Sequence, residues 1–189
     1  MKHNSLLEQL NFLKIALLDY KIGALSRSSK YVVNAVVRDF DNQSLQKVVE
    51  FGPGDGVMTK ELLHRMPSHG QLIIIESSPR FIEVLKKIED PRLKIIEGTI
   101  QDALKELEKN QLSNIDLVVS SIPFSMLKPD ERDKVVHDTF NILHNNGEFV
   151  IFHQYSRLML TPLKKYFNNV TSHFEPRNFL PCFIMYAKK

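Results

Sequence analysis

The sequence predicts an α/β domain built on a mostly parallel sheet that is buried on both faces. Short apolar runs alternate with helix-compatible stretches along the 189 residues. Most of these runs are too continuously apolar for a sheet with one solvated face. The first run leads into a glycine-dense turn at residues 52–56, which is typical of a strand-to-helix turn that holds a ligand. The length suits one domain, and 43% hydrophobic with 25% charged residues is ordinary globular composition.

The expected elements follow from these runs and from the turn and cap residues between them. Strands are expected at residues 47–51, 72–76, 93–97, 115–120 and 148–154. Helices are expected at residues 57–66, 79–88, 103–109 and 129 to about 143, where Asn145-Asn146-Gly147 predicts a stop. Thr161-Pro162 predicts an N-cap and first turn of a helix to residue 167. Apolar segments at residues 170–174 and 183–187 are expected to pair as an antiparallel edge.

Residues 1–25 are expected to form a separate helical segment, before a single domain at residues 26–189. Leu6, Leu10, Leu13 and Leu17 recur at helical spacing among charged residues, which predicts an amphipathic helix. Such a helix can lie in a membrane interface or pack over the edge of the domain, and both interpretations stay open.

The glycine turn indicates a cationic, adenosine-type ligand. It carries Glu50 and Asp55 and no Lys or Arg, and its glycines do not follow the G-x-G-x-x-G spacing of dinucleotide sites. Twenty residues past Gly56, a second apolar run ends on Glu76, where a carboxylate can accept hydrogen bonds from both ribose hydroxyls. The alternative is a tight turn that binds nothing.

Residues 50–56 resemble the E-x-G-x-G-x-G motif of class I S-adenosylmethionine (SAM) methyltransferases. The resemblance implies a Rossmann-like seven-stranded sheet in the order 3-2-1-4-5-7-6, with helices on both faces, SAM as the cofactor and S-adenosylhomocysteine (SAH) as its product. Thr99 and Ile100 stand where the family often has an acid that contacts adenine, so Thr99, backbone groups or Asp102 would take that role. The cofactor-binding residues implied are Ser28, Ser29, Glu50, Gly52, Pro53, Gly54, Gly56, Glu76, Ser77, Thr99, Ile100 and Ser120.

Residues 121–124 resemble the [Asn/Asp/Ser]-x-Pro-aromatic signature of amino-group methyltransferases. Methyl transfer from a sulfonium mainly requires an aligned nitrogen lone pair and exclusion of water. The Ser121 hydroxyl and carbonyls held by Pro123 can accept hydrogen bonds from an amine, while Phe124 can offer a π face to a cation. The alternative is an ordinary apolar loop.

The wider resemblance is to bacterial phospholipid N-methyltransferases and, through them, to ribosomal RNA adenine dimethylases. It implies phosphatidylethanolamine and its methylated derivatives as substrates, with Arg177 binding the lipid phosphate, Asn178 adding a donor and Tyr155 facing the amine. His153 is expected to be structural. The stretches that carry the resemblance are residues 23–29, 48–56, 118–127, 149–155 and 177–181.

Two other functions are weighed against this one. An RNA adenine-N6 methyltransferase would share the cofactor site, but the dimethylases usually have Asn where Ser121 stands and continue into an RNA-binding domain beyond the position of Lys189. A non-enzymatic SAM-fold scaffold is the third interpretation.

Charge and cysteine usage suggest a location and a partner. The net charge of +3 is distributed as +4 in residues 1–38, −6 in the middle and +5 in residues 157–189, which favours an anionic partner, either phospholipid or nucleic acid, or else a solvated surface. A single cysteine, no apolar run of about 18 residues and no signal sequence predict a cytoplasmic protein, peripheral on the inner membrane face where it meets lipid. No metal-ligand cluster is expected.

Overall fold

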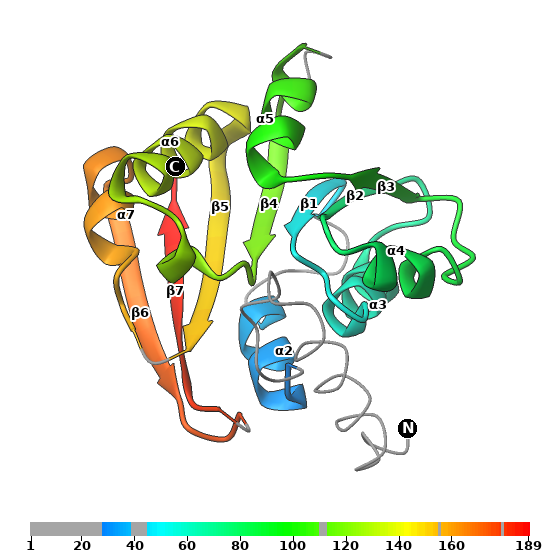
Figure 1. Ribbon diagram of the computed structural model, residues 1–189, viewed down its shortest axis with the longest axis horizontal. Coiled ribbons are helices and arrows are strands. Elements are labelled where there is room, and N and C mark those ends of the chain that lie inside the picture. Colours follow the sequence, from blue (N-terminus) through cyan, green and yellow to red (C-terminus); the bar gives the residue numbers. More distant parts are fainter. Residues whose placement is uncertain (1–27, 39–44, 110–112, 155, 179) are drawn as a thin grey trace.

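The computed structural model describes residues 28–38, 45–109, 113–154, 156–178 and 180–189, and these form one seven-stranded sheet with helices on both faces (Figure 1). The strand order is β3-β2-β1-β4-β5-β7-β6, which confirms the expected topology. Strands β1 to β5 are parallel to one another, and β7 is antiparallel to β5 and β6. The strands are β1 (Lys47–Phe51), β2 (Gln71–Glu76), β3 (Leu93–Glu97), β4 (Ile115–Ser120), β5 (Leu143–Gln154), β6 (Asn169–Glu175) and β7 (Cys182–Lys188).

Two apolar layers lie on opposite faces of the sheet because successive strand residues point to opposite sides. Val49 and Phe51 of β1 belong to the layer covered by α5 (Ile100–Lys109), α6 (Pro129–Ile142) and α7 (Leu160–Tyr166). Val48 belongs to the layer covered by α2 (Lys30–Val37), α3 (Val57–Arg65) and α4 (Pro79–Leu85). The central strands are therefore buried on both sides, as their continuous apolar runs predict.

Several element boundaries differ from the sequence prediction: α4 ends at Leu85 and not at residue 88, and α5 begins at Ile100 and not at residue 103. α6 ends at Ile142, close to the expected position, but the Asn145-Asn146-Gly147 turn does not end it, because β5 already begins at Leu143 and the turn forms an irregularity inside that strand. The register with β4 shifts from Ile115 opposite Leu143 to Leu117 opposite Glu148, and Asn146 adopts a φ of 75°. The predicted Thr161 N-cap is wrong, because α7 begins at Leu160 with Met159 at its N-cap.

The carboxyl ends of the parallel strands share one edge of the sheet, where backbone hydrogen bonds join their loops. The Gly52 N–H donates to the Ile75 carbonyl at 2.9 Å, and the Ser121 N–H donates to the Phe51 carbonyl at 3.1 Å. A short 3-10 helix, η1 (Phe124–Met126), follows β4 at this edge. In a sheet of this type, ligands bind outside the carboxyl ends of the strands.

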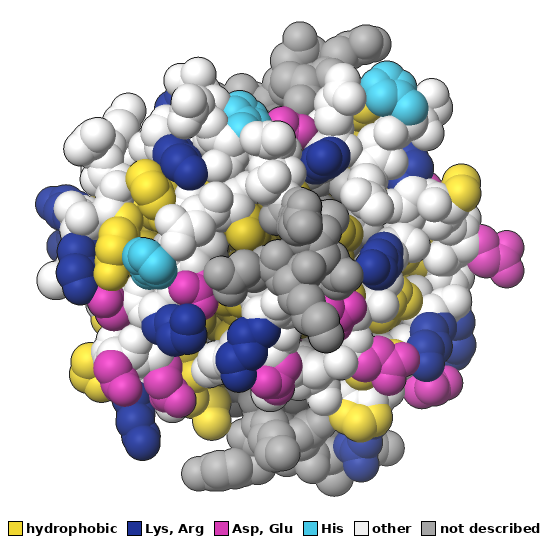
Figure 2. Space-filling model, turned by 90° about the horizontal axis from the view of Figure 1, so that it is seen from above, with side chains coloured by type: hydrophobic (Ala, Val, Ile, Leu, Met, Phe, Trp, Pro, Cys, Tyr) yellow, Lys and Arg dark blue, Asp and Glu magenta, His cyan; other side chains and the backbone are white. Residues whose placement is uncertain are grey.

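The predicted amphipathic segment 1–25 lies outside the described residues. Within the described ranges, no helix combines the length and the apolar character needed to cross a membrane. On the face seen in Figure 2, Lys and Arg side chains are interspersed with Asp and Glu side chains, which is typical of a solvated surface.

Cys182 opens β7 and lies with 1% exposure in the apolar layer on the α2 side of the sheet. Burial, together with the nearby Glu175 carboxylate, raises the pKa of the thiol to about 12. The thiol is therefore held in its protonated form.

Candidate functional site

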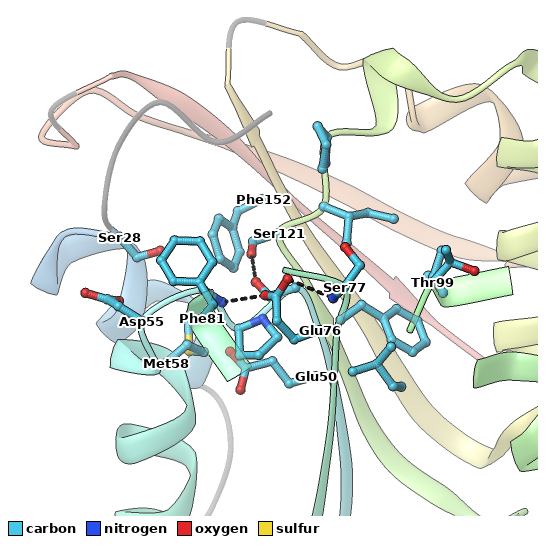
Figure 3. Close-up of a pocket in the computed structure, with 18 of the residues that line it drawn as sticks. Ser28, Glu50, Asp55, Met58, Glu76, Ser77, Phe81, Thr99, Ser121 and Phe152 are labelled. Atoms are coloured by element: carbon cyan, nitrogen blue, oxygen red, sulfur yellow. Dashed lines mark hydrogen bonds between the residues drawn. The ribbon is translucent and has the colours of Figure 1, made fainter. Parts of the chain in front are cut away.

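A pocket lies at the carboxyl edge of the sheet, between the loops that follow β1, β2, β3 and β4 (Figure 3). The end of β5 and Ser28, two residues before α2, also line it. Eleven of the residues expected from the sequence line it together: Ser28, Glu50, Gly52, Pro53, Gly54, Glu76, Ser77, Thr99, Ile100, Ser121 and Pro123.

The glycine turn brings the β1 loop close to the β4 loop. Gly52 has a φ of 71°, and a Cβ at that position would lie 2.9 Å from Cγ2 of Ile122. Gly54, at a φ of 58°, lines the pocket and donates its N–H to the Glu76 carboxylate at 3.1 Å. Only glycine combines these backbone angles with so close an approach.

Glu76 ends β2 with its carboxylate held by three backbone N–H groups. Oε1 accepts from Ser77 and Ser78, both at 2.9 Å, and Oε2 accepts from Gly54. Figure 3 shows the carboxylate at the centre of the pocket wall, with dashed lines to these loops. These N–H groups fix the orientation of the carboxylate in the pocket wall, so the group is preorganised for the expected hydrogen bond from ribose.

Glu50 is the buried acid of the pocket, with 2% exposure. Its Oε2 accepts a hydrogen bond from the Thr59 hydroxyl of α3 at 2.6 Å. Burial raises the pKa of Glu50 to about 8, and the neighbouring Glu76 and Asp55 carboxylates add to the rise. A cationic ligand beside it would favour the ionised form and reverse this shift.

The charges of the lining fit a cation and not a pyrophosphate. Within the described part of the chain, Glu50, Asp55 and Glu76 line the pocket and no Lys or Arg does so. SAM carries a sulfonium and an ammonium, and the turn, the ribose acceptor and these three acids match that charge distribution.

The region expected to contact adenine is committed partly to helix capping. The Thr99 hydroxyl donates to the Asp102 carboxylate at 2.7 Å and accepts the Asp102 N–H at 3.3 Å, across the first turn of α5. Beside it, Gly98 has a φ of 147°, and a Cβ there would meet nothing within 4 Å. Gly98 and Gln101 line the pocket beside Thr99, whose hydroxyl is already used in these two hydrogen bonds.

Ser121 is fixed at the side of the pocket that is expected to hold the methyl acceptor. Its hydroxyl donates to the Gly52 carbonyl at 2.6 Å, so the Oγ lone pairs remain to accept a hydrogen bond from an amine N–H. Pro123 also lines this side. Ile122, Met126 and Phe152 add apolar surface, and the Met126 side chain is 53% exposed at the edge of the pocket.

The expected π contact from Phe124 does not occur in this arrangement, because its ring is fully buried in the apolar layer on the α6 side. The turn of η1 directs the ring inward, and the Phe124 carbonyl accepts a hydrogen bond from Nε of Arg132 at 2.8 Å. The aromatic ring that does line the pocket belongs to Phe152.

Several other predicted site residues lie outside the pocket lining. Gly56 faces Leu85 and Ile88 around α4, with a would-be Cβ 3.0 Å from each side chain. Ser120 is fully buried in β4. Three more predicted residues lie together near the start of α2, where Asn178 accepts the Ser29 N–H and Arg177 lies over the Tyr31 ring. Tyr155 lies outside the described residues.

Sequence reasoning missed Met58, Phe81, Phe152 and Gln154, which all line the pocket. Phe152 and Gln154 share one face of β5 through the two-residue strand period, and this signal was available in the sequence. His153 points to the opposite face, where burial lowers its pKa below the ordinary range. It therefore does not face the pocket, in line with the structural role expected of it.

Many of the C-terminal basic residues are used internally. Lys165 pairs with Asp133 at 2.8 Å, and Lys189 donates to the Phe140 and Leu143 carbonyls. Arg177 pairs with Glu175 at 2.7 Å. These contacts reduce the positive charge that this segment offers to an anionic partner.

The strand order and the acid-lined pocket at the glycine turn together define a class I SAM-dependent methyltransferase. The family model described as "Ribosomal RNA adenine dimethylase" matches residues 27–145, which is more than half of the chain. The chain therefore belongs to the ribosomal RNA adenine dimethylase family.

Curated relatives of two kinds are similar to the chain. An ornithine lipid N-methyltransferase of Singulisphaera acidiphila is 25% identical over 162 residues, covering 85% of this chain and 84% of that protein. A ribosomal RNA small subunit methyltransferase A of Mycoplasma capricolum is 32% identical over 96 residues, covering 49% of this chain and 35% of that protein. The chain thus matches only about a third of the length of the latter relative.

Solved structures share the fold at low identity. An O-methyltransferase from Bacillus cereus in complex with SAH has a TM-score of 0.72 at 14% identity and covers all of this chain and 93% of that one. A precorrin-6y C5,15-methyltransferase from Geobacter metallireducens has a TM-score of 0.64 at 15% identity, covering 84% of this chain and 88% of that one. These structures bear on the fold, and the family match together with the methyltransferase relatives gives SAM as the cofactor and SAH as its product.

Proposed function

We propose that the protein transfers methyl groups from SAM to the amine headgroup of a membrane lipid, namely phosphatidylethanolamine and its methylated derivatives or a chemically similar aminolipid. The observation that carries this proposal is the alignment with the ornithine lipid N-methyltransferase over more than four fifths of both chains.

The acceptor side of the pocket supports a lipid amine. SAM, when bound, supplies an electrophilic methyl group. Ser121 presents lone pairs that can hold an amine N–H, since its own hydrogen is donated to the Gly52 carbonyl. Ile122 and Phe152 exclude water from the reacting groups, which strengthens the alignment of a neutral amine. The exposed Met126 suits contact with the apolar part of a lipid.

The substrate ammonium must lose a proton before its nitrogen can attack. His153, on the other face of β5, is not placed to take it. Transfer of this proton to water at the pocket entrance is compatible with a site that aligns the amine through neutral acceptors.

The second candidate is an RNA adenine-N6 methyltransferase, favoured by the family match over residues 27–145 and by the ribosomal RNA methyltransferase relatives. An adenine amino group would use the same Ser121 acceptor and would stack against an aromatic ring such as Phe152.

The test gives the full chain methyl-labelled SAM together with vesicles containing phosphatidylethanolamine, vesicles containing ornithine lipid, or undermethylated small ribosomal subunits. Label in either lipid fraction supports the proposal and identifies the headgroup. Label in RNA alone overturns it in favour of the second candidate. Ser121→Ala serves as the control, because true transfer should fall in that variant while SAM binding persists.

A further inference from the structure

A side chain near the end of the sequence holds the beginning of α2. Oδ1 of Asn178 accepts the Ser29 N–H at 2.9 Å, joining residues 149 positions apart. Nδ2 of the same amide donates to the Leu180 carbonyl at 2.8 Å, which fixes the orientation of the side chain within its own loop. Asn178 is only 7% exposed, so water competes little with these two hydrogen bonds.

Arg177, the residue before Asn178, also contacts the first turn of α2, through the Tyr31 ring. Its Nε and Nη2 donate to the Glu175 carboxylate at 2.8 and 2.7 Å, and its guanidinium carbon lies 4.3 Å from the centre of the Tyr31 ring. The carboxylate is almost fully buried, and this ion pair holds the pKa of Glu175 below its ordinary range. The planar fork of Arg177 is thus already occupied by a carboxylate.

The first turn of α2, which Asn178 and Arg177 contact, lies next to the cofactor pocket in the sequence. Ser28 lines the pocket and immediately precedes Ser29, the N-cap of α2. Figure 3 shows the Ser28 hydroxyl turned toward the ring of Phe81, which also lines the pocket. The rest of α2 is anchored independently: Val32 and Val36 are fully buried, and the Tyr186 hydroxyl donates to the Ala35 carbonyl at 2.9 Å.

We propose that Asn178 is a positioning residue for the cofactor, which acts by fixing the N-terminus of α2 and so holding Ser28 against the pocket. Arg177 supports it by bracing the β6–β7 loop against Glu175 and Tyr31. The Arg-Asn pair then serves SAM binding and does not serve recognition of a lipid phosphate. This role is independent of which acceptor the enzyme methylates.

The test measures SAH binding by calorimetry, without any methyl acceptor. Asn178→Ala should raise the dissociation constant roughly three- to tenfold, the usual effect of one lost partly buried hydrogen bond. Tyr186→Phe is the matched control, because it loosens α2 at the end far from the pocket and should leave the dissociation constant unchanged. In a Ser28→Ala background, Asn178→Ala should have less than about a twofold effect, since two residues that act through one contact are not additive.

Thermal unfolding of each variant establishes that the fold is intact. If Asn178→Ala fails to fold, Tyr31→Ala takes its place. It removes the contact between Arg177 and the first turn of α2 and should also raise the SAH dissociation constant. Unchanged SAH affinity in folded Asn178→Ala, or in Tyr31→Ala where that variant replaces it, overturns the proposal, as does an equal loss in Tyr186→Phe. A rise in the Michaelis constant for lipid with unchanged SAH affinity also overturns it and restores the phosphate role.

Discussion

Replacing Glu50 with glutamine should stabilise the cofactor-free protein and weaken its binding of SAM. The Glu50 side chain is buried, and desolvation is the main cause of its raised pKa. Glutamine has nearly the same shape, can still accept the Thr59 hydrogen bond, and resembles the protonated acid. The variant therefore removes the cost of burying a carboxylate without leaving a cavity.

The expected size follows from the pKa of about 8 in the folded protein, against an ordinary value of 4.5. Between these two pH values the folded protein keeps a proton that the unfolded chain has released, so stability falls as the pH rises. This loss is under about 1 kcal/mol at pH 5, about 3 kcal/mol at pH 7 and about 5 kcal/mol above pH 8. Glu50→Gln has no such proton to lose and should escape this part of the pH dependence.

Urea unfolding at pH 5, 7 and 9 measures the difference between wild type and Glu50→Gln. The advantage of the variant should grow with pH, while Glu89→Gln, a change at an exposed acid, should show no such trend. SAH affinity should fall at least roughly tenfold in Glu50→Gln, because a charged acceptor for the ammonium is lost. A variant that is less stable than wild type at pH 9, or an advantage that does not change with pH, would refute the reasoning.

Three further substitutions test the rest of the pocket. Gly52→Ala places a Cβ 2.9 Å from Ile122 at a φ of 71°, so it should lower the unfolding free energy by roughly 1–3 kcal/mol and abolish SAH binding; wild-type thermal stability would contradict this. Glu76→Ala removes the acceptor for three backbone N–H groups and for ribose, and calorimetry should show SAH affinity reduced by roughly tenfold or more; retained affinity would mean that the ribose lies elsewhere. Ser121→Ala should lower kcat roughly tenfold with little change in the KM for SAM, and an equal loss of SAH affinity would argue against an acceptor-side role.

The parts of the fold and site that depend on local sequence were predictable. The central strands are visible in the sequence as continuous apolar runs. The glycine turn combines the positive φ angles with two acids of the pocket, Glu50 and Asp55, within a few residues. Glu76 follows from the same logic, since it stands at the end of the next strand. The bounds of β1, β3 and β4 accordingly match the expected ranges.

The parts of the fold and site that depend on tertiary packing could not be predicted from the sequence. An aromatic residue after Pro123 reads the same whether its ring faces the ligand or the core, and only the turn of η1 sends Phe124 inward. An Asn-Asn-Gly segment normally ends an element, yet β4 pairs with Leu143 before it and with Glu148 after it, so β5 continues through it. The contact between Ser29 and Asn178 has no local signature, because the chain between them builds almost the whole domain.

Cys182 is placed so that the reactivity of its thiol reports local unfolding of the sheet around β7. Its thiol is the single one in the sequence. It lies on β7, which pairs with β5 and β6, in the apolar layer that α2 covers. A buried thiol with a pKa of about 12 is inert to alkylating reagents until the surrounding strands separate. The rate of alkylation therefore measures how often the antiparallel pair β6 and β7 opens and exposes the thiol, and no engineered label is required.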